Sequence, residues 1–361
     1  MTAHGMTAHT LPAIDVEQMH SDRWVARWLF LCAAMVFAMA VIGAITRLTE
    51  SGLSIMEWAL FTGVLPPFTE AEWQRLFALY QQIPEFQQDN PDMTLAEFKG
   101  IFWWEYIHRL WGRLIGVVFA LPFLWFLLRG KLAKGLLPHL LALLALGALQ
   151  GGLGWFMVAS GFSDRTDVSQ YRLVMHLGLA VVIYIYLVRV ALGLRHPRRE
   201  PSPDRRAIVL RRGIMTLLGL ILLTMLSGGF VAGLNAGMIY NTFPLMDGRL
   251  VPAGYGDLSP WILNLTENLA AVQFNHRVLA VLTALLAVVL WFWGRHLHLA
   301  PKVRGLLMIL AGFALVQAGL GVWTLLAVVP VSLGALHQAG ALVFLTLALL
   351  TLFHLRPARG L

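Results

Sequence analysis

Eight long apolar runs constrain this chain more than any other feature. A helix needs about 20 mostly apolar residues to cross a lipid bilayer, and such runs recur throughout the 361-residue sequence. The predicted spans cover residues 28–46, 103–128, 136–158, 171–193, 213–234, 269–294, 304–326 and 333–355. With 58% hydrophobic and 13% charged residues, the sequence excludes a soluble domain and predicts an all-α membrane protein.

The distribution of charge predicts how the chain sits in the membrane. Of the 27 Lys and Arg residues, 18 fall on the side of the two termini, and the other side holds 9 of them with 14 of the 19 acidic residues. Because basic residues accumulate on the cytoplasmic side, we expect both termini in the cytoplasm. We interpret the excess of Lys and Arg on the side of the termini as part of this asymmetry across the membrane, so no nucleic-acid partner is expected. The single cysteine, Cys32, excludes an internal disulfide.

The chain also repeats itself in order. The stretch EYIHRLWGRLIGVV at 105–118 is echoed by QFNHRVLAVLTALL at 273–286, and LQGGLGWFMV at 149–158 by VQAGLGVWTL at 316–325. The interval from the first His to the Gln is 42 residues in one half and 41 in the other. This order predicts eight transmembrane helices arranged as two tandem, pseudo-symmetric four-helix bundles. Each bundle has an even number of spans, so the copies should be related by an axis along the membrane normal.

The repeat sets the domain boundaries. The sequence predicts a cytoplasmic tail at 1–27, an N-terminal bundle at 28–194, a basic inner linker at 195–212, a C-terminal bundle at 213–356 and a C-terminal tail at 357–361. The first bundle includes a long outer loop at 47–102. Its stretch TEAEWQRLFALYQQI is amphipathic, and we expect a helix on the membrane face. The following PEFQQDNPDMT predicts a loop by its Pro, Asn and Asp content.

Four of the twelve histidines differ from the rest by their depth in the spans. His108, His176, His276 and His337 fall one to two turns into the second, fourth, sixth and eighth spans, entering from the outer side. The other eight lie in the N-terminal tail or at the inner ends of spans. A polar residue inside a membrane span is a functional hypothesis by default.

Two imidazoles per bundle suit the two axial positions of a haem iron held between facing helices. We therefore predict one haem between His108 and His176 and a second between His276 and His337, both near the outer leaflet. A zinc site would need three or four protein ligands, and no further ligands stand nearby. Histidines that only hydrogen-bond between helices remain an alternative.

An arginine follows the first histidine of each half. Arg109 and Arg277 lie at the outer rim, where a guanidinium group can pair with a haem propionate through two charge-assisted hydrogen bonds. Snorkelling of these side chains to lipid headgroups is the competing explanation. The glycines near Gln150 and Gln317 would let either helices or a porphyrin approach closely, and of the two we favour helix packing. These glycines are Gly151, Gly152, Gly154, Gly319 and Gly321.

The two halves differ three residues before the histidine, where the first has Glu105 and the second has Gln273. A carboxylate beside a haem edge can take up a proton, whereas an amide cannot. This difference predicts chemistry in the first bundle and a stably held electron-transfer haem in the second. The alternative is an interfacial glutamate at a helix start, where it meets the positive end of the helix dipole.

Seven stretches together resemble the heme A synthase family over nearly the whole chain. They are ITRLTESGLSIMEW (45–58), EYIHRLWGRLIG (105–116), QGGLGWFMV, LVMHLGLA, GGFVAGLNAGMIYNTFPLM (228–246), FNHRVLA and LGALHQAGA. The resemblance implies a membrane enzyme of cytochrome oxidase assembly that oxidises a ring methyl of heme O to a formyl group through a hydroxymethyl intermediate. Some bacterial members carry a cysteine pair in the first outer loop. This chain has none there and is similar to the proteobacterial and mitochondrial branch.

The resemblance also implies roles for particular residues. It places a haem b cofactor on His276 and His337, and the substrate heme O, which becomes the product heme A, on His108 and His176. Glu105 falls on the family's functionally important acidic position. Rim positions at Arg47, Glu50 and Asn235 belong to the matching stretches after spans one and five.

The implied setting is the bacterial cytoplasmic (inner) membrane, with the haem sites toward the periplasm. The implied partners are the lipid bilayer, heme O synthase, cytochrome oxidase subunit I or its assembly factors, and an electron-transfer partner. Two other classes use some of the same features. A dihaem cytochrome linked to quinol would only pass electrons through these histidines, and a transporter would place its polar groups near the midplane on broken helices.

Overall fold

The computed structural model describes residues 16–59, 62–162, 166–196 and 206–355, and within them the chain is helical almost throughout. The long helices are α1 (Val16–Leu48), α4 (Leu95–Leu128), α5 (Leu137–Val158), α6 (Gln170–Arg195), α7 (Ala207–Gly233), α8 (Leu269–Gly294), α9 (Pro301–Leu326) and α10 (Val331–His354). Each is long and apolar enough to cross a membrane. In the described residues the only β-type pairing is an isolated bridge between Met246 and Arg249. The predicted all-α membrane protein with eight spans is therefore confirmed.

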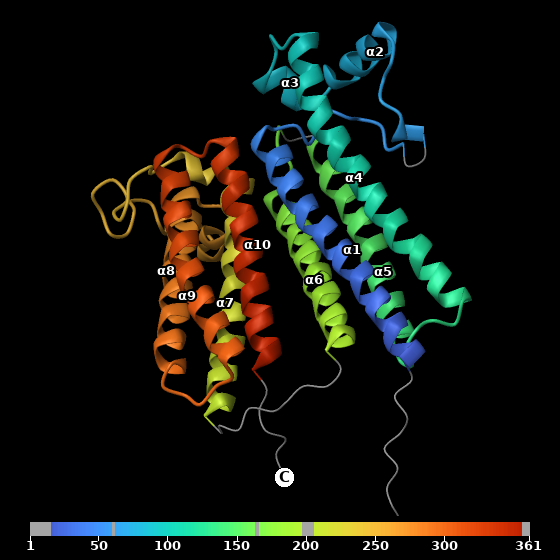
Figure 1. Ribbon diagram of the computed structural model, residues 1–361. Helices are drawn as coiled ribbons and strands as arrows, with labels where there is room; N and C mark the ends of the chain where they lie inside the picture. The colour runs from blue at the N-terminus through green and yellow to red at the C-terminus, as the bar shows by residue number, and fades with distance from the viewer. Residues whose placement is uncertain (1–15, 60–61, 163–165, 197–205, 356–361) are drawn as a thin grey trace, which may run out of the picture.

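The long helices form two groups of four (Figure 1). Helices α1, α4, α5 and α6 lie on one side, and α7 to α10 lie on the other. The groups meet where α1 packs on α10 and α6 packs on α7. In the sequence repeat α1 corresponds to α7 and α6 to α10, so these two contacts are equivalent. This arrangement agrees with two tandem bundles related by a twofold axis.

The four deep histidines all lie toward one end of the molecule, which we call the histidine end. At this end α1 and α7 finish and α6 and α10 begin, and it is the upper end in Figure 1. Glycines bring the two bundles together there. A Cβ on Gly233 of α7 would lie 2.7 Å from the Cβ of Gln170 on α6, and one on Gly334 of α10 would lie 2.6 Å from Cδ1 of Leu48 on α1. Small residues let these helix backbones approach closely.

Polar contacts also join the two bundles at the histidine end. Arg47, at the end of α1, donates from Nη2 to Oδ1 of Asn235 at 3.0 Å and lies 3.5 Å from Oδ2 of Asp167. The Asn235 amide donates to the same Asp167 oxygen at 3.4 Å. Nearer the middle of the spans, the hydroxyls of Tyr184 on α6 and Thr346 on α10 lie 2.7 Å apart. The two bundles are thus held together at more than one level.

The first connection, residues 47–102, forms a small helical cap above α4 (Figure 1). Its helices are α2 (Glu70–Tyr80) and α3 (Pro84–Asp89), with a short 3₁₀ turn at Thr62–Val64. The amphipathic helix predicted here is present, and the Thr69–Glu72 capping box fixes its start. Its apolar side packs on α4 through Trp73, whose ring centroid lies 4.8 Å from that of Phe102.

The loop predicted for PEFQQDNPDMT is wrong in its first part, because Pro84–Asp89 forms α3. Proline at the first helical position is already in a helical conformation, and the preceding Ile83 anchors the turn with a buried side chain. A 3₁₀ turn at Ala159–Gly161 follows α5, and two more, Ala236–Met238 and Trp261–Leu265, lie in the second connection.

Several helices run past the spans predicted from hydropathy. Helix α4 begins at Leu95 rather than at 103, because Thr94 and Glu97 form a capping box. Helix α1 begins at Val16, inside the predicted tail, and α7 begins at Ala207, inside the predicted linker. Apolar runs mark the hydrocarbon region, whereas backbone hydrogen bonding continues into the polar flank. Residues 1–15, the linker centre at 197–205 and the tail at 357–361 lie outside the described residues.

Candidate functional site

The four histidines come from alternate helices and form two pairs. His176, His276 and His337 each lie about two turns into α6, α8 and α10. His108 lies deeper in α4 only because that helix extends beyond the bundle into the cap. His108 and His176 belong to the first group of four helices, and His276 and His337 belong to the second. Each bundle therefore brings two imidazoles together near the histidine end.

A glycine lies beside each of the four rings. A Cβ on Gly43 would come 3.4 Å from Nε2 of His108, and one on Gly154 would come 3.2 Å from Cε1 of His176. In the second bundle the same construction gives 3.1 Å from Gly228 to Cε1 of His276, and 2.8 Å from Gly321 to Cε1 of His337. A side chain at Gly154, Gly228 or Gly321 would crowd an imidazole, whereas one at Gly43 would be in ordinary contact with its ring. The glycines thus leave room for the rings and for a flat group between them.

Two glutamines hold the second histidine of each pair. In the first bundle, Gln150 Nε2 donates to the backbone oxygen of His176 at 3.1 Å and lies 3.2 Å from its Nδ1. Gln317 repeats these contacts to His337 at 2.9 and 3.2 Å. The Oε1 atoms of both glutamines are buried and have no partner within the described residues. Sequence reasoning used the two glutamines only to align the repeat and assigned them no role.

These observations fit a haem in each bundle better than the alternatives. Within the described ranges no group of three or more His, Cys, Asp or Glu side chains is arranged to hold a metal ion. Hydrogen bonding between helices accounts for His176, His276 and His337, but within those ranges the His108 ring has no hydrogen-bond partner. Paired imidazoles, a glycine at each ring and a buried unsatisfied oxygen in each bundle suit a bis-histidine haem.

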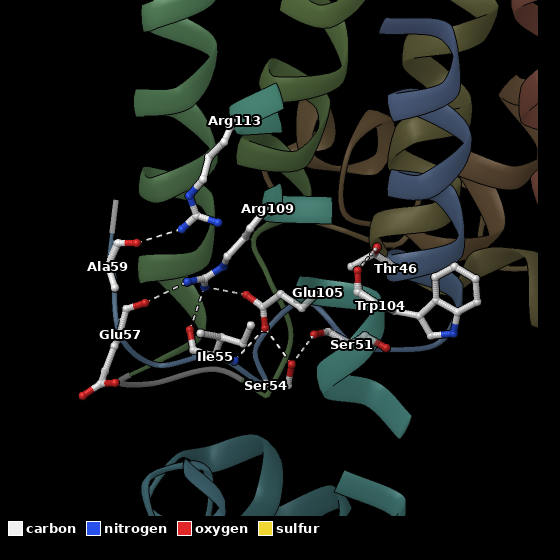
Figure 2. Close-up of polar contacts among 10 residues, drawn as sticks. All are labelled: Thr46, Ser51, Ser54, Ile55, Glu57, Ala59, Trp104, Glu105, Arg109 and Arg113. Carbon is white, nitrogen blue, oxygen red and sulfur yellow. Dashed lines mark hydrogen bonds and ion pairs between the residues drawn. The ribbon is translucent and has the colours of Figure 1, made fainter. Parts of the chain in front are cut away.

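Glu105 lies at the centre of a dense polar contact set at the histidine end of α4 (Figure 2). Its Oε2 accepts hydrogen bonds from Ser54 Oγ at 2.8 Å and from the Ile55 amide at 2.6 Å. Its Oε1 accepts from Arg109 Nη2 at 2.5 Å, one turn further along the helix. The residue is 2% exposed and lies almost three turns inside α4, so the interpretation as a glutamate at a helix start is wrong.

Gln273 occupies the equivalent place in the second bundle, but it donates hydrogen bonds to its connecting segment, whereas Glu105 accepts them. Its Nε2 donates to the carbonyls of Ala236 at 2.8 Å and Ile239 at 2.5 Å. Its Oε1 accepts from Arg277 Nη2 at 2.9 Å. A carboxylate can only accept hydrogen bonds, whereas an amide group also donates. Each connecting segment therefore presents the backbone groups that match its own side chain.

The two arginines fasten these segments to the bundles. Arg109 donates to the carbonyls of Ile55 at 2.6 Å and Glu57 at 2.8 Å, and Arg277 donates to those of Tyr240 at 2.5 Å and Thr242 at 2.7 Å. The Arg109 side chain is only 10% exposed, so it does not snorkel to headgroups. Its pairing with a propionate, like that of Arg277, stays a prediction. The buried Nε of Arg277 has no partner within the described residues.

The predicted rim residues have structural roles at the ends of α1 and α7. Arg47 and Asn235 contact each other across the bundles, as described above. Glu50 and Asn235 occupy matching left-handed backbone positions, with φ of 51° and 52°. Of the glycines singled out in the sequence, Gly154 and Gly321 contact histidines, whereas Cβ atoms on Gly151, Gly152 and Gly319 would meet nothing within 4 Å.

The sequence was compared with known proteins. Residues 26–349 match the family model described as cytochrome oxidase assembly protein. The chain is 54% identical over 333 residues to a protein named Heme A synthase from Rhodospirillum centenum, covering 92% of this chain and 88% of the relative. The like-named protein of Nitrosomonas eutropha is 49% identical over 340 residues, with 93% and 95% covered. That of Caulobacter vibrioides is 48% identical over 335 residues, with 91% and 96% covered.

Proposed function

The chain belongs to the family of cytochrome oxidase assembly proteins, and we propose that it is a heme A synthase. The activity is the oxidation of a ring methyl of heme O to a formyl group, which gives heme A through a hydroxymethyl intermediate. The observation that supports it most directly is the pairing of deep histidines in both bundles, with an ionisable Glu105 in only one.

The first bundle binds the substrate in this proposal. The side chains of His108 and His176 hold the iron of heme O and so fix the ring relative to Glu105, which lies one turn before His108 on α4. The Arg109 and Ser54 donors and the Ile55 amide hold the Glu105 carboxylate in one orientation. A fixed carboxylate can accept the proton that leaves the methyl carbon.

Two successive two-electron oxidations, each of which adds the oxygen of one water molecule to that carbon and releases two protons, give a gem-diol, which loses water to form the aldehyde. The four electrons pass to the electron-transfer partner. The second bundle serves the electron transfer that these oxidations require. His276 and His337 would hold a haem b, and Arg277 follows His276 on α8. When bound, this haem supplies one-electron redox chemistry. Gln273 beside it exchanges no proton, which suits a site that only passes electrons.

The charge distribution supports a cytoplasmic location for both termini, and the histidine end then faces the periplasm across the bacterial inner membrane. The substrate carries a farnesyl tail, which the apolar spans accommodate. We expect heme O synthase to deliver heme O, and subunit I of cytochrome oxidase or its assembly factors to receive heme A. A further electron-transfer partner completes the redox cycle.

Extraction of pigments from the purified protein tests this function. A heme A synthase yields haem b together with heme A or its hydroxymethyl precursor. A dihaem cytochrome that passes electrons to or from quinol yields haem b alone, and a transporter yields no haem. Either of the last two results, in protein made in cells that supply heme O, contradicts the proposal. The spectrum should also show a six-coordinate low-spin haem that disappears when His276 is replaced.

A further inference from the structure

One hydrogen bond breaks the match between the two bundles at the first histidine of each pair. In the second bundle, Ser227 Oγ of α7 lies 2.8 Å from Nδ1 of His276. In the first bundle the His108 ring has no hydrogen-bond partner within the described part of the chain. The second histidines share their main contacts, because Gln150 and Gln317 each lie 3.2 Å from the Nδ1 atom of their histidine. Gln150 Nε2 also lies 3.3 Å from Nε2 of His176.

The residue that corresponds to Ser227 is Ile42 of α1. A constant offset of 185 residues relates Gly43 to Gly228, which contact the two histidines. The same offset relates the carbonyl groups that accept hydrogen bonds from Arg109 to those that accept from Arg277. Ile55 corresponds to Tyr240, and Glu57 corresponds to Thr242. One residue before Gly228, the same offset pairs Ser227 with Ile42. The first bundle therefore replaces the hydroxyl with an apolar side chain.

A second contact of the Ser227 hydroxyl fixes the direction of its hydrogen bond with His276. The Ser227 hydroxyl donates to the backbone carbonyl of Thr224 at 2.8 Å, so its single proton is already used. The contact to His276 must then run from an Nδ1–H donor to the serine oxygen. This places the imidazole proton on Nδ1 and leaves the Nε2 lone pair free for iron.

The two rings are also turned differently. His276 presents its Cε1 and Nδ1 atoms to Gly228, at 3.1 and 3.6 Å from the constructed Cβ. His108 presents Nε2 and Cδ2 to Gly43, at 3.4 and 3.8 Å. Without the serine, the His108 ring thus rests with Nε2 toward α1. Within the described residues no hydrogen bond fixes the His108 ring, whereas the His276 ring is held by its contact with Ser227.

We propose that Ser227 is a positioning residue that makes the haem of the second bundle a permanent one, and that Ile42 at the matching place makes the haem of the first bundle releasable. This inference rests on the proposed function, in which one haem is a cofactor and the other is a substrate that must leave as product. Outer partners of metal-bound histidines change metal affinity by about 10- to 100-fold.

The test uses the complete protein in detergent and two reciprocal substitutions. In Ser227→Ala, we expect haem b to pass to apomyoglobin about 10-fold faster than in the parent protein. Its midpoint potential should become more positive, because the imidazole loses a hydrogen bond that increases its basicity. Ser227→Thr keeps the hydroxyl and should restore both values. A general loss of packing would not raise the midpoint potential of the haem, and threonine would not reverse its effect.

In Ile42→Ser, the first bundle gains the hydroxyl, and we expect more heme A to remain on the purified protein with a slower transfer to apomyoglobin. This variant lies in the other bundle, so it tests the idea even if Ser227→Ala does not fold. Unchanged transfer rates and potential in the folded variants would overturn the inference while leaving the synthase assignment intact. A parent protein that contains no haem b would instead contradict the proposed function.

Discussion

The two bundles share one plan but differ in how tightly one pair of helices packs. In the second bundle α8 packs closely against α9, whereas the equivalent α4 has few contacts with α5. The difference is visible residue by residue. Leu144 and Gly147 of α5 are exposed, while the matching residues of α9, Ala311 and Ala314, are 4% and 1% exposed. The first bundle is therefore open along a face that is closed in the second.

The open face lies beside the pair of histidines to which we assign the substrate. Helix α4 carries His108, and α5 carries Gln150, which contacts His176. A large prenylated substrate in the bilayer needs a lateral way in, and a resident cofactor does not. Under the proposed function, the bundle that exchanges its haem is the one with the looser helix contact and without the serine hydrogen bond.

Removing a first histidine should separate the two bundles most strongly. We expect His276→Ala to lose the low-spin haem b signal and with it all conversion of heme O. His108→Ala should keep that signal and lose only the conversion. Absorption spectra and pigment extraction of both variants provide the measurement. Equal loss of haem b in the two variants would mean that the bundles do not have separate roles.

Exchanging the side chains at the acid position should have the next largest effect. Glu105→Gln removes the proton acceptor, and we expect conversion to fall roughly 100-fold or more with haem content near normal. The matched variant Gln273→Glu turns a carboxylate toward the carbonyls of Ala236 and Ile239, so it should destabilise the second bundle. Heme A formation at the parental rate by Glu105→Gln would remove this residue from the catalytic role.

Leucine substitutions test whether the face between α4 and α5 is open to substrate. A Cβ on Gly147 would meet nothing within 4 Å, so Gly147→Leu should leave stability nearly unchanged but raise KM for heme O several-fold. Ala314→Leu, at the equivalent buried place, should lower the free energy of unfolding by about 1–3 kcal/mol through overpacking. Similar unfolding temperatures for the two variants would show that the two faces are packed alike.

The smallest effect concerns the connections at the histidine end. In the cap, burial raises the pKa of Glu85, and together with the smaller effect of the nearby carboxylates of Asp167, Glu105, Glu50 and Asp89 it brings this pKa to about 8. No acidic side chain is buried in the described second connection, 235–268. An unfolded glutamate has a pKa of 4.5, so the folded cap holds one more proton between pH 4.5 and 8.

The free energy of unfolding should therefore fall as the pH rises through that window, by at most about 1.4 kcal/mol per pH unit. Glu85→Gln should remove this slope, and Asp92→Asn, at an exposed position of the cap that does not contribute to the shift, should preserve it. Thermal unfolding at pH 5 and pH 8 measures the difference. An unchanged slope in Glu85→Gln would show that another group titrates in this range.

Much of the fold could be predicted because it depends on local patterns. Apolar length identified the eight spans, and the matched order of His and Gln identified the halves that the structure places as equivalent groups. Helix ends were harder to predict. Capping at Thr94 and the packing of Ile83 extend helices into polar sequence, and hydropathy does not register either effect.

The candidate site was only partly predictable from sequence. Depth in the spans identified the four histidines, and comparison of the halves identified Glu105 and Gln273. The partners of these residues were missed. Arg109 and Arg277 bind backbone carbonyls that lie more than thirty residues away in the chain, and no periodicity encodes such contacts.

The sequence by itself determined how many helices cross the membrane, which residues repeat and where ionisable groups enter the apolar region, because these follow from composition and spacing along one chain. Only the tertiary structure decided that Ser227 reaches His276 while Ile42 leaves His108 without a partner, and that α5 is exposed where α9 is buried. Such differences depend on distances of a few tenths of an ångström between helices. Hydrogen bonding and packing vary steeply over those distances, whereas the one-dimensional pattern of a sequence does not.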